Sequence, residues 1–181
     1  MSAPLFLRPG EYFFGRCEGS VVTLLGSCVA IILWHPQQRL VGVSHYLLPR
    51  RLQHHPDPAD PAYEPDGDEQ DTRYGSAVFQ RLLGDIRASG VPASHYRKGI
   101  FGGGRLVQDA SSPIARIGQN NIQFARRCFE QLGWAIDQQD VDGAAYRRLQ
   151  VDGLSGRVSC ECRPSLGLPP GKPHDQSLYR R

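Results

Sequence analysis

The fold is decided by a stretch near the start of the chain, VVTLLGSCVAIILW at residues 21–34. Two apolar runs, 21–25 and 28–34, are separated there by a glycine and a serine. Short continuous apolar runs predict buried strands, although a short helix is also compatible with the second. A third apolar run, 40–48, follows a turn and ends at Pro49. We therefore expect a hairpin of two buried segments, 28–34 and 40–48.

Outside this hairpin, the sequence predicts more strands than helices. Apolar residues recur at helical spacing over 74–89 and 121–132, and each segment is followed by a glycine suited to end a helix. Strand patterns cover 11–14, 96–101, 134–138, 146–151 and 157–163. Because the strands do not alternate regularly with helices, a doubly wound parallel fold is disfavoured. The expected class is a mixed, strand-rich α/β domain with two main helices around one core.

Length and charge predict one domain with a loop and a tail. The chain has 181 residues, which suits a single domain, assigned here to residues 1–163. Residues 50–72 are rich in Pro and are expected to form a loop, and the range 55–72 within it holds seven acidic residues and no Lys or Arg. Elsewhere 21 basic residues face 11 acidic ones, a net +10 that suits an acidic partner. Residues 164–181 are rich in Pro and Gly and are expected to form a flexible C-terminal tail.

Several classes of protein are disfavoured. The longest apolar run is far shorter than the roughly 20 residues that span a bilayer, and residues 1–10 lack the apolar core of a signal peptide. We therefore expect a cytoplasmic protein without membrane insertion. No basic run interleaved with aromatic residues indicates nucleic-acid binding. The pair Cys160-x-Cys162 predicts packing rather than a zinc site, because no second pair of ligands accompanies it. No metal is expected.

The sharpest chemical candidate is Cys28. Gly26 and Ser27 precede it, and such small residues permit a turn that aims the Cys28 N–H into a cleft beside its own sulfur. A thiol reacts as the thiolate and needs a nearby base, which His45 in the next apolar run can supply. Thr23 can accept a hydrogen bond from the far nitrogen of that imidazole and fix its tautomer. The alternative is that Cys28 and His45 are ordinary packed residues.

Two further motifs are candidates for a substrate groove. Three glycines at 102–104 follow a strand, and Gly103 and Gly104 can allow a ligand or another chain to approach the backbone closely; a tight turn is the alternative. Asn121 opens the second expected helix, where it is a natural N-cap or lines the site beside the glycines.

Taken in order, these motifs are similar to those of a known family. The segments TLLGSCVA at 23–30 and SHYLLP at 44–49 resemble the CheD family of chemoreceptor glutamine deamidases. The resemblance continues through RYG at 73–75, IFGGG at 100–104, IGQNN at 117–121 and DVDG at 140–143. It covers roughly residues 11–163 and ends in the last hairpin, with one glycine of the family's late turn missing or displaced. The order of the motifs makes the match more specific than any one of them.

The resemblance implies a fold and a chemistry. It implies a mixed α/β sandwich akin to that of cysteine-dependent deamidating toxins, with Cys28 as nucleophile, His45 as its histidine and Thr23 as third residue. The expected reaction converts glutamines of methyl-accepting chemotaxis receptors to glutamate and ammonia, without a cofactor. A CheC-type phosphatase is a further expected partner. The alternatives are a docking module without catalysis and a cysteine amidase with another substrate.

Overall fold

Five strands precede the first of two long helices, one strand separates the helices, and three strands follow the second. The computed structural model describes residues 3–50, 71–107 and 112–164. The first five strands are β1 (Leu5–Leu7), β2 (Tyr12–Arg16), β3 (Ser20–Leu25), β4 (Val29–His35) and β5 (Leu40–Ser44). The α-helices and the other strands are α1 (Gly75–Ser89), β6 (Arg97–Gly102), α2 (Ile117–Gln131), β7 (Gln138–Val141), β8 (Ala145–Asp152) and β9 (Val158–Pro164). Two short 3-10 helices, Ala93–His95 and Pro113–Arg116, precede β6 and α2.

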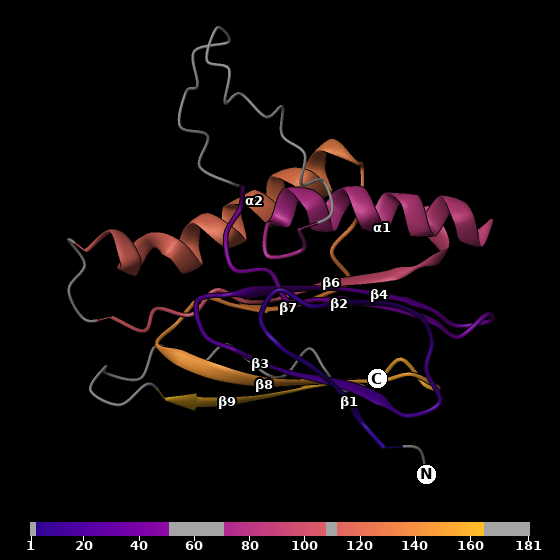
Figure 1. The fold of residues 1–181 in the computed structure, drawn as a ribbon, viewed down its shortest axis with the longest axis horizontal. Helices are drawn as coiled ribbons and strands as arrows, with labels where there is room; N and C mark the ends of the chain where they lie inside the picture. Colours follow the sequence, from indigo (N-terminus) through magenta and orange to yellow (C-terminus); the bar gives the residue numbers. More distant parts are fainter. Residues whose placement is uncertain (1–2, 51–70, 108–111, 165–181) are drawn as a thin grey trace, which may run out of the picture.

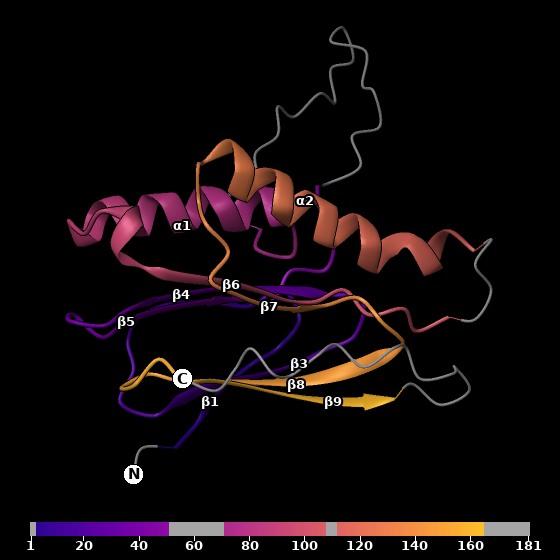
Figure 2. The same cartoon turned by 180° about the vertical axis from the view of Figure 1, so that it is seen from behind.

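These elements form three layers. One sheet has five strands in the order β2-β5-β4-β6-β7, and the other has four in the order β1-β3-β8-β9. Figures 1 and 2 show both helices on one face of the five-stranded sheet and the four-stranded sheet on its other face. This arrangement confirms the expected mixed, strand-rich α/β sandwich.

Strand β4 lies in the middle layer, and every one of its residues is buried. Successive side chains of a strand point to opposite faces. Val29, Ile31 and Leu33 therefore pack toward the helices, while the even-numbered residues between them pack toward the four-stranded sheet. Burial on both faces explains the unbroken apolar run. It also divides the expected single core into two apolar layers, one on each side of the five-stranded sheet.

The predicted hairpin of 28–34 and 40–48 is present as antiparallel β4 and β5. Ile32 lies opposite Val43. The same register continues beyond β5 to an isolated bridge between Val29 and Tyr46. Two backbone hydrogen bonds close this bridge, from Val29 to Tyr46 at 3.1 Å and back at 3.0 Å. The start of β4 is therefore held beside the segment that follows β5.

Three sequence expectations need correction. The strand expected over 134–138 is wrong: the strand β7 begins at Gln138, and Trp134 packs its ring against Phe129 at a centroid distance of 5.6 Å. The second helix begins at Ile117 rather than at residue 121, because a short 3-10 turn leads directly into it. The short strand β1 was not expected; it pairs in parallel with β3.

The expected acidic loop and tail fall mostly beyond the described part of the chain. Residues 51–70 of the predicted loop and 165–181 of the predicted tail lie outside the described residues, whereas Pro164 ends β9. Among the helices that are described, none is both long and apolar enough to cross a bilayer.

Candidate active site

The Cys28 and His45 side chains share one face at the same end of neighbouring strands. In the β4–β5 register Cys28 lies opposite Leu47, two residues beyond His45. Diagonal neighbours of this kind are within reach of each other across an antiparallel pair. Because Val29 and Tyr46 point toward the helices, Cys28 and His45 both point toward the four-stranded sheet. The fold thus brings the two predicted residues together.

Thr23 reaches His45 from the opposite sheet. Its Oγ1 lies 2.7 Å from His45 Nδ1, and the same hydroxyl donates to the carbonyl oxygen of Leu7 at 2.8 Å. A hydroxyl has one proton, which is used on Leu7, so Thr23 accepts from His45 Nδ1–H. The hydrogen-bond network therefore assigns the proton of the neutral imidazole to Nδ1 and leaves Nε2 with a free lone pair. The contact expected between Thr23 and His45 is present.

His45 Nε2 is the basic atom of the site. The side chain is 1% exposed, and Nε2 has no hydrogen-bond partner among the described residues. Burial lowers the pKa of His45 to about 4, and the nearby Glu11 carboxylate offsets only part of this effect. At neutral pH the imidazole is therefore uncharged and able to accept a proton.

The backbone at Cys28 is fixed by the glycines that follow β6. Gly103 N–H donates to the Cys28 carbonyl at 2.7 Å, and Gly104 N–H donates to the Gly26 carbonyl at 2.7 Å. The N–H of Cys28 has no acceptor among the described residues apart from its own side chain. Burial raises the pKa of the Cys28 thiol, and this N–H offsets part of the rise. The geometry holds a neutral thiol beside a backbone donor.

Gly102 explains why glycine is needed in this turn. Its φ of 108° is strained for other residues, and a Cβ there would lie 2.2 Å from the Cys28 carbonyl oxygen. Gly103 and Gly104 are buried as well. Gly103 and Gly104 bind the Cys28 loop through their backbone N–H groups. This role favours the tight-turn alternative over contact with a substrate.

Asn121 joins the segment before Cys28 to the segment after His45. Its Nδ2 donates to the Ser27 carbonyl at 3.0 Å and to the Leu47 carbonyl at 2.8 Å. The Tyr46 hydroxyl in turn donates to the Asn121 carbonyl at 2.6 Å. Asn121 lies inside α2 and is fully buried, so the expectation that it caps this helix is wrong. Its amide instead fixes the segment before Cys28 to the segment after His45.

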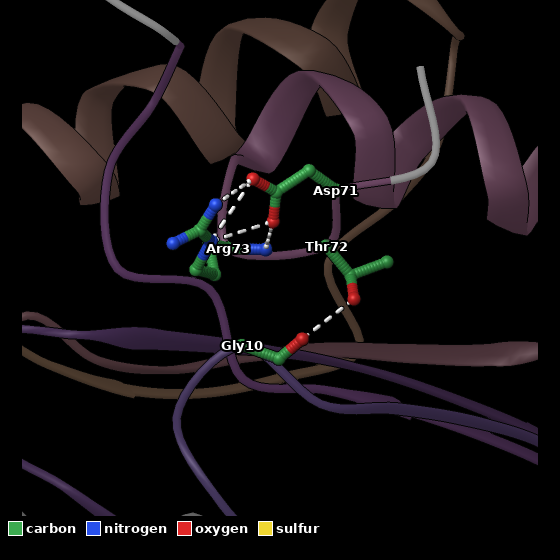
Figure 3. Close-up of polar contacts among 4 residues, drawn as sticks. All are labelled: Gly10, Asp71, Thr72 and Arg73. Atoms are coloured by element: carbon green, nitrogen blue, oxygen red, sulfur yellow. Dashed lines mark hydrogen bonds and ion pairs between the residues drawn. The ribbon is translucent and has the colours of Figure 1, made fainter. Parts of the chain in front are cut away.

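Residues 71–73, which lead into α1, are hydrogen-bonded to Gly10 and to the segment after His45. Thr72 donates through its hydroxyl to the Gly10 carbonyl at 2.5 Å, next to an Asp71–Arg73 ion pair (Figure 3). Gly10 N–H donates to the His45 carbonyl at 2.7 Å, and Leu47 N–H donates to the Arg73 carbonyl at 2.8 Å. The chain entering α1 therefore helps to hold the segment after β5 that carries His45.

A broad surface depression of about 990 Å³ lies elsewhere. Polar residues at the start of β3 and at the β4–β5 turn line it, and neither Cys28 nor His45 is among them. It sits at the opposite end of these strands, because Cys28 precedes β4 whereas the turn follows it. Its volume therefore says nothing about the chemistry of Cys28.

Comparison with known proteins places the chain in a family. A family model described as "CheD chemotactic sensory transduction" matches residues 56–162, more than half of the chain. The chain belongs to the CheD family. The matched range includes the glycine turn and Asn121. It begins after Cys28 and His45 and so includes neither of them.

Named relatives cover most of the chain. A probable chemoreceptor glutamine deamidase CheD 3 from Dechloromonas aromatica (strain RCB) is 33% identical over 85% of this chain and 84% of its own length. A probable chemoreceptor glutamine deamidase CheD 1 from Chromobacterium violaceum is 34% identical over 85% of this chain and 75% of its own length. A CheD protein with the same activity in its name, from Pseudomonas fluorescens (strain SBW25), is 31% identical over 91% of this chain and 86% of its own.

The low pKa of His45 predicts a pH-dependent stability for this CheD protein. Between about pH 6.5 and 4 the unfolded chain binds a proton at residue 45 and the folded chain does not, so stability falls as the pH falls. The shift corresponds to about 3 kcal/mol of unfolding free energy lost across this window. We expect His45→Gln to remove that part of the slope in urea unfolding measured between pH 4 and 7.

The exposed His95 provides the matched control for this measurement. His95→Gln is expected to keep the slope of the unaltered protein. An unchanged slope in His45→Gln would contradict the assigned protonation of the buried imidazole.

Proposed function

We propose that this CheD protein is a protein-glutamine deamidase that converts glutamines of methyl-accepting chemotaxis receptors to glutamate with release of ammonia. One observation carries the proposal: the buried imidazole of His45, its Nδ1 held by Thr23, leaves Nε2 unpartnered on the face where Cys28 lies. The names of the relatives supply the class of substrate. The cytoplasmic region of the receptors would be the target, so we expect the protein to act in the cytoplasm.

In the proposed reaction, Cys28 Sγ attacks the carboxamide carbon while His45 Nε2 takes the thiol proton. Because burial favours the neutral forms of both groups, proton transfer accompanies the attack rather than preceding it as a stable thiolate–imidazolium pair. The oxyanion accepts from the Cys28 backbone N–H. His45 then returns its proton to the nitrogen, the C–N bond breaks, and ammonia leaves a thioester on Cys28.

Water completes the cycle. His45 Nε2 removes a proton from a water molecule that attacks the thioester carbonyl. The C–S bond breaks, the proton passes to sulfur, and the product is glutamate. Ser27, Gly26, Gly103, Gly104 and Asn121 position the Cys28 loop for these steps through their backbones or amide.

The direct test uses a receptor cytoplasmic fragment incubated with the full chain. Site-resolved mass spectrometry is expected to show glutamine-to-glutamate conversion at discrete positions, together with equimolar ammonia. Conversion of small amides without conversion of the receptor would instead indicate a cysteine amidase with another substrate. Tight binding of the fragment without conversion would indicate a docking module. Binding of a CheC-type phosphatase stays a prediction of the family resemblance.

Thr23 is proposed as a positioning residue, and its side chain offers a conservative control. Thr23→Val leaves His45 Nδ1–H and the Leu7 carbonyl unpaired, which costs about 1–3 kcal/mol of stability and frees the imidazole to change tautomer. We expect kcat to fall at least about tenfold with KM little changed. Thr23→Ser keeps the hydroxyl and should restore most of kcat. Equal losses in both variants would contradict this role.

A further inference from the structure

A second cluster of reactive side chains lies at one open edge of the sandwich. Ligand atoms of Asp140, Cys160 and Cys162 lie within 4.8 Å of one another. Asp140 is on β7 and the cysteines are on β9, which are edge strands of the two different sheets. Both edge strands are one strand away from the strands of the Cys28 site. In one sheet β6 lies between β4 and β7, and in the other β8 lies between β3 and β9. The cluster is therefore outside the proposed catalytic site.

The register of β9 turns both thiols toward the other sheet. Cys160 lies opposite Leu149 and Cys162 lies opposite Arg147, and both of these β8 residues are buried between the sheets. Cys160 is half-buried, while Cys162 is exposed to solvent. The two thiols thus line the gap between the edges, and one of them is open to an ion from solution.

Arg147 orients the carboxylate of Asp140 toward the thiols. Its Nε and Nη2 lie 2.9 Å and 2.8 Å from Asp140 Oδ1. The other oxygen, Oδ2, is left facing Cys162 Sγ at 3.5 Å. The Arg147 side chain is 3% exposed, and its Nη1 has no partner among the described residues. A hydrogen-bonded partner behind a ligating carboxylate is what metal sites require of their surroundings.

Charge and geometry favour a divalent cation over other occupants. Two thiolates and a carboxylate carry three negative charges, which a divalent cation and the Arg147 guanidinium balance to zero. A disulfide fits poorly, because side chains two residues apart on a strand project in parallel from Cα atoms about 6.6 Å apart. Disulfides need Cβ atoms about 4 Å apart. Zn–S bonds of about 2.3 Å, by contrast, let one ion join two parallel thiolates.

We propose that Cys160, Cys162 and Asp140 bind a thiophilic divalent cation of the Zn²⁺ type, which joins the edges of the two sheets. Arg147 is the positioning residue that holds the carboxylate. The fourth coordination position faces solvent beside the exposed Cys162, where a water molecule completes a tetrahedral set. This proposal is independent of the deamidase function and assigns no role to the ion in the reaction at Cys28.

The test titrates the reduced full chain with Zn²⁺ in competition with a chromophoric chelator. We expect one tightly bound ion per chain, and a thiolate-to-metal charge-transfer band when Co²⁺ replaces Zn²⁺. Loss of an orienting partner alone lowers metal affinity by roughly 10–100-fold. Cys162→Ser, which removes a ligand at an exposed position, is therefore expected to weaken binding by at least about 100-fold and to abolish the band.

Two control variants separate this site from the other thiols. Cys28→Ala and Cys128→Ser, which alter cysteines outside the cluster, are expected to bind Zn²⁺ as the unaltered chain does. Zn²⁺ should also raise the Tm of the unaltered chain but not that of Cys162→Ser. Unchanged affinity in Cys162→Ser, loss of binding in Cys28→Ala, or a Cys160–Cys162 disulfide without metal uptake would each overturn the proposal.

Discussion

Cys28→Ala is expected to lower the rate of receptor glutamine deamidation by at least about 10³-fold, because removal of a nucleophile eliminates the covalent route. The residual rate would reflect substrate binding and the backbone donor alone. The fold should persist, since the loop carrying Cys28 is held by backbone bonds from Gly103 and Gly104 and by the Asn121 amide. The measurement is the initial rate of ammonia release from a receptor fragment at saturating substrate.

Cys128→Ala provides the matched control for Cys28→Ala. Cys128 is a half-buried thiol on α2 that packs against the core, and its substitution should leave the rate within about twofold of the unaltered protein. Retention of a tenth or more of the rate in Cys28→Ala would show that another group carries the reaction.

The second large effect is expected from His45→Gln. This substitution removes the unpartnered Nε2 that accepts the thiol proton, and general base catalysis contributes about 10²–10⁴-fold. We expect kcat/KM to fall by that factor at pH 7, where His45 is neutral in the unaltered protein. His95→Gln again serves as the control and should leave kcat/KM nearly unchanged, since His95 is exposed.

The result must be separated from a loss of fold. Because His45 is buried, the fraction of folded His45→Gln is measured by urea unfolding at the assay pH, and rates are referred to folded protein. A folded His45→Gln variant with less than a tenfold loss would contradict the assignment of Nε2 as the base.

The middle layer could be predicted from sequence because of its physical position. Strand β4 is covered on both faces, so its residues form an unbroken apolar run that stands out in the chain. The hairpin with β5 followed from the turn between the two runs. The strand predicted over 134–138 was wrong because the Trp134 ring packs against Phe79 and Phe129 on the two helices and Trp134 pairs with no strand in the described part of the chain.

The candidate site was only partly predictable. Cys28 and His45 are polar or reactive residues in apolar runs, a signal that sequence reasoning can detect. Asn121 was assigned to a helix start because IGQNN at 117–121 has the composition of a cap, whereas the structure uses its buried amide to join two loops. The tautomer of His45 depends on the Leu7 carbonyl, which lies on a strand that was not expected.

The cluster at the sandwich edge shows a different limit of sequence reasoning. Cys160-x-Cys162 suggested packing because no second pair of ligands follows it in the sequence. The third ligand, Asp140, comes from a strand of the other sheet, and only the stacking of the two sheets places it beside the thiols. Spacing along the chain cannot reveal such a group.

The central claim is that Cys28 forms a thioester with a receptor glutamine, and trapping with hydroxylamine tests it most directly. A thioester transfers its acyl group to this nucleophile, so site-resolved mass spectrometry should find γ-glutamyl hydroxamate at the positions that otherwise become glutamate. The unaltered chain is predicted to give hydroxamate in proportion to hydroxylamine, whereas Cys28→Ala should give at most about a thousandth of either product. Glutamate formed by Cys28→Ala at a tenth or more of the rate of the unaltered chain would contradict the thioester. Glutamate formed by the unaltered chain without hydroxamate at any hydroxylamine concentration would contradict it as well.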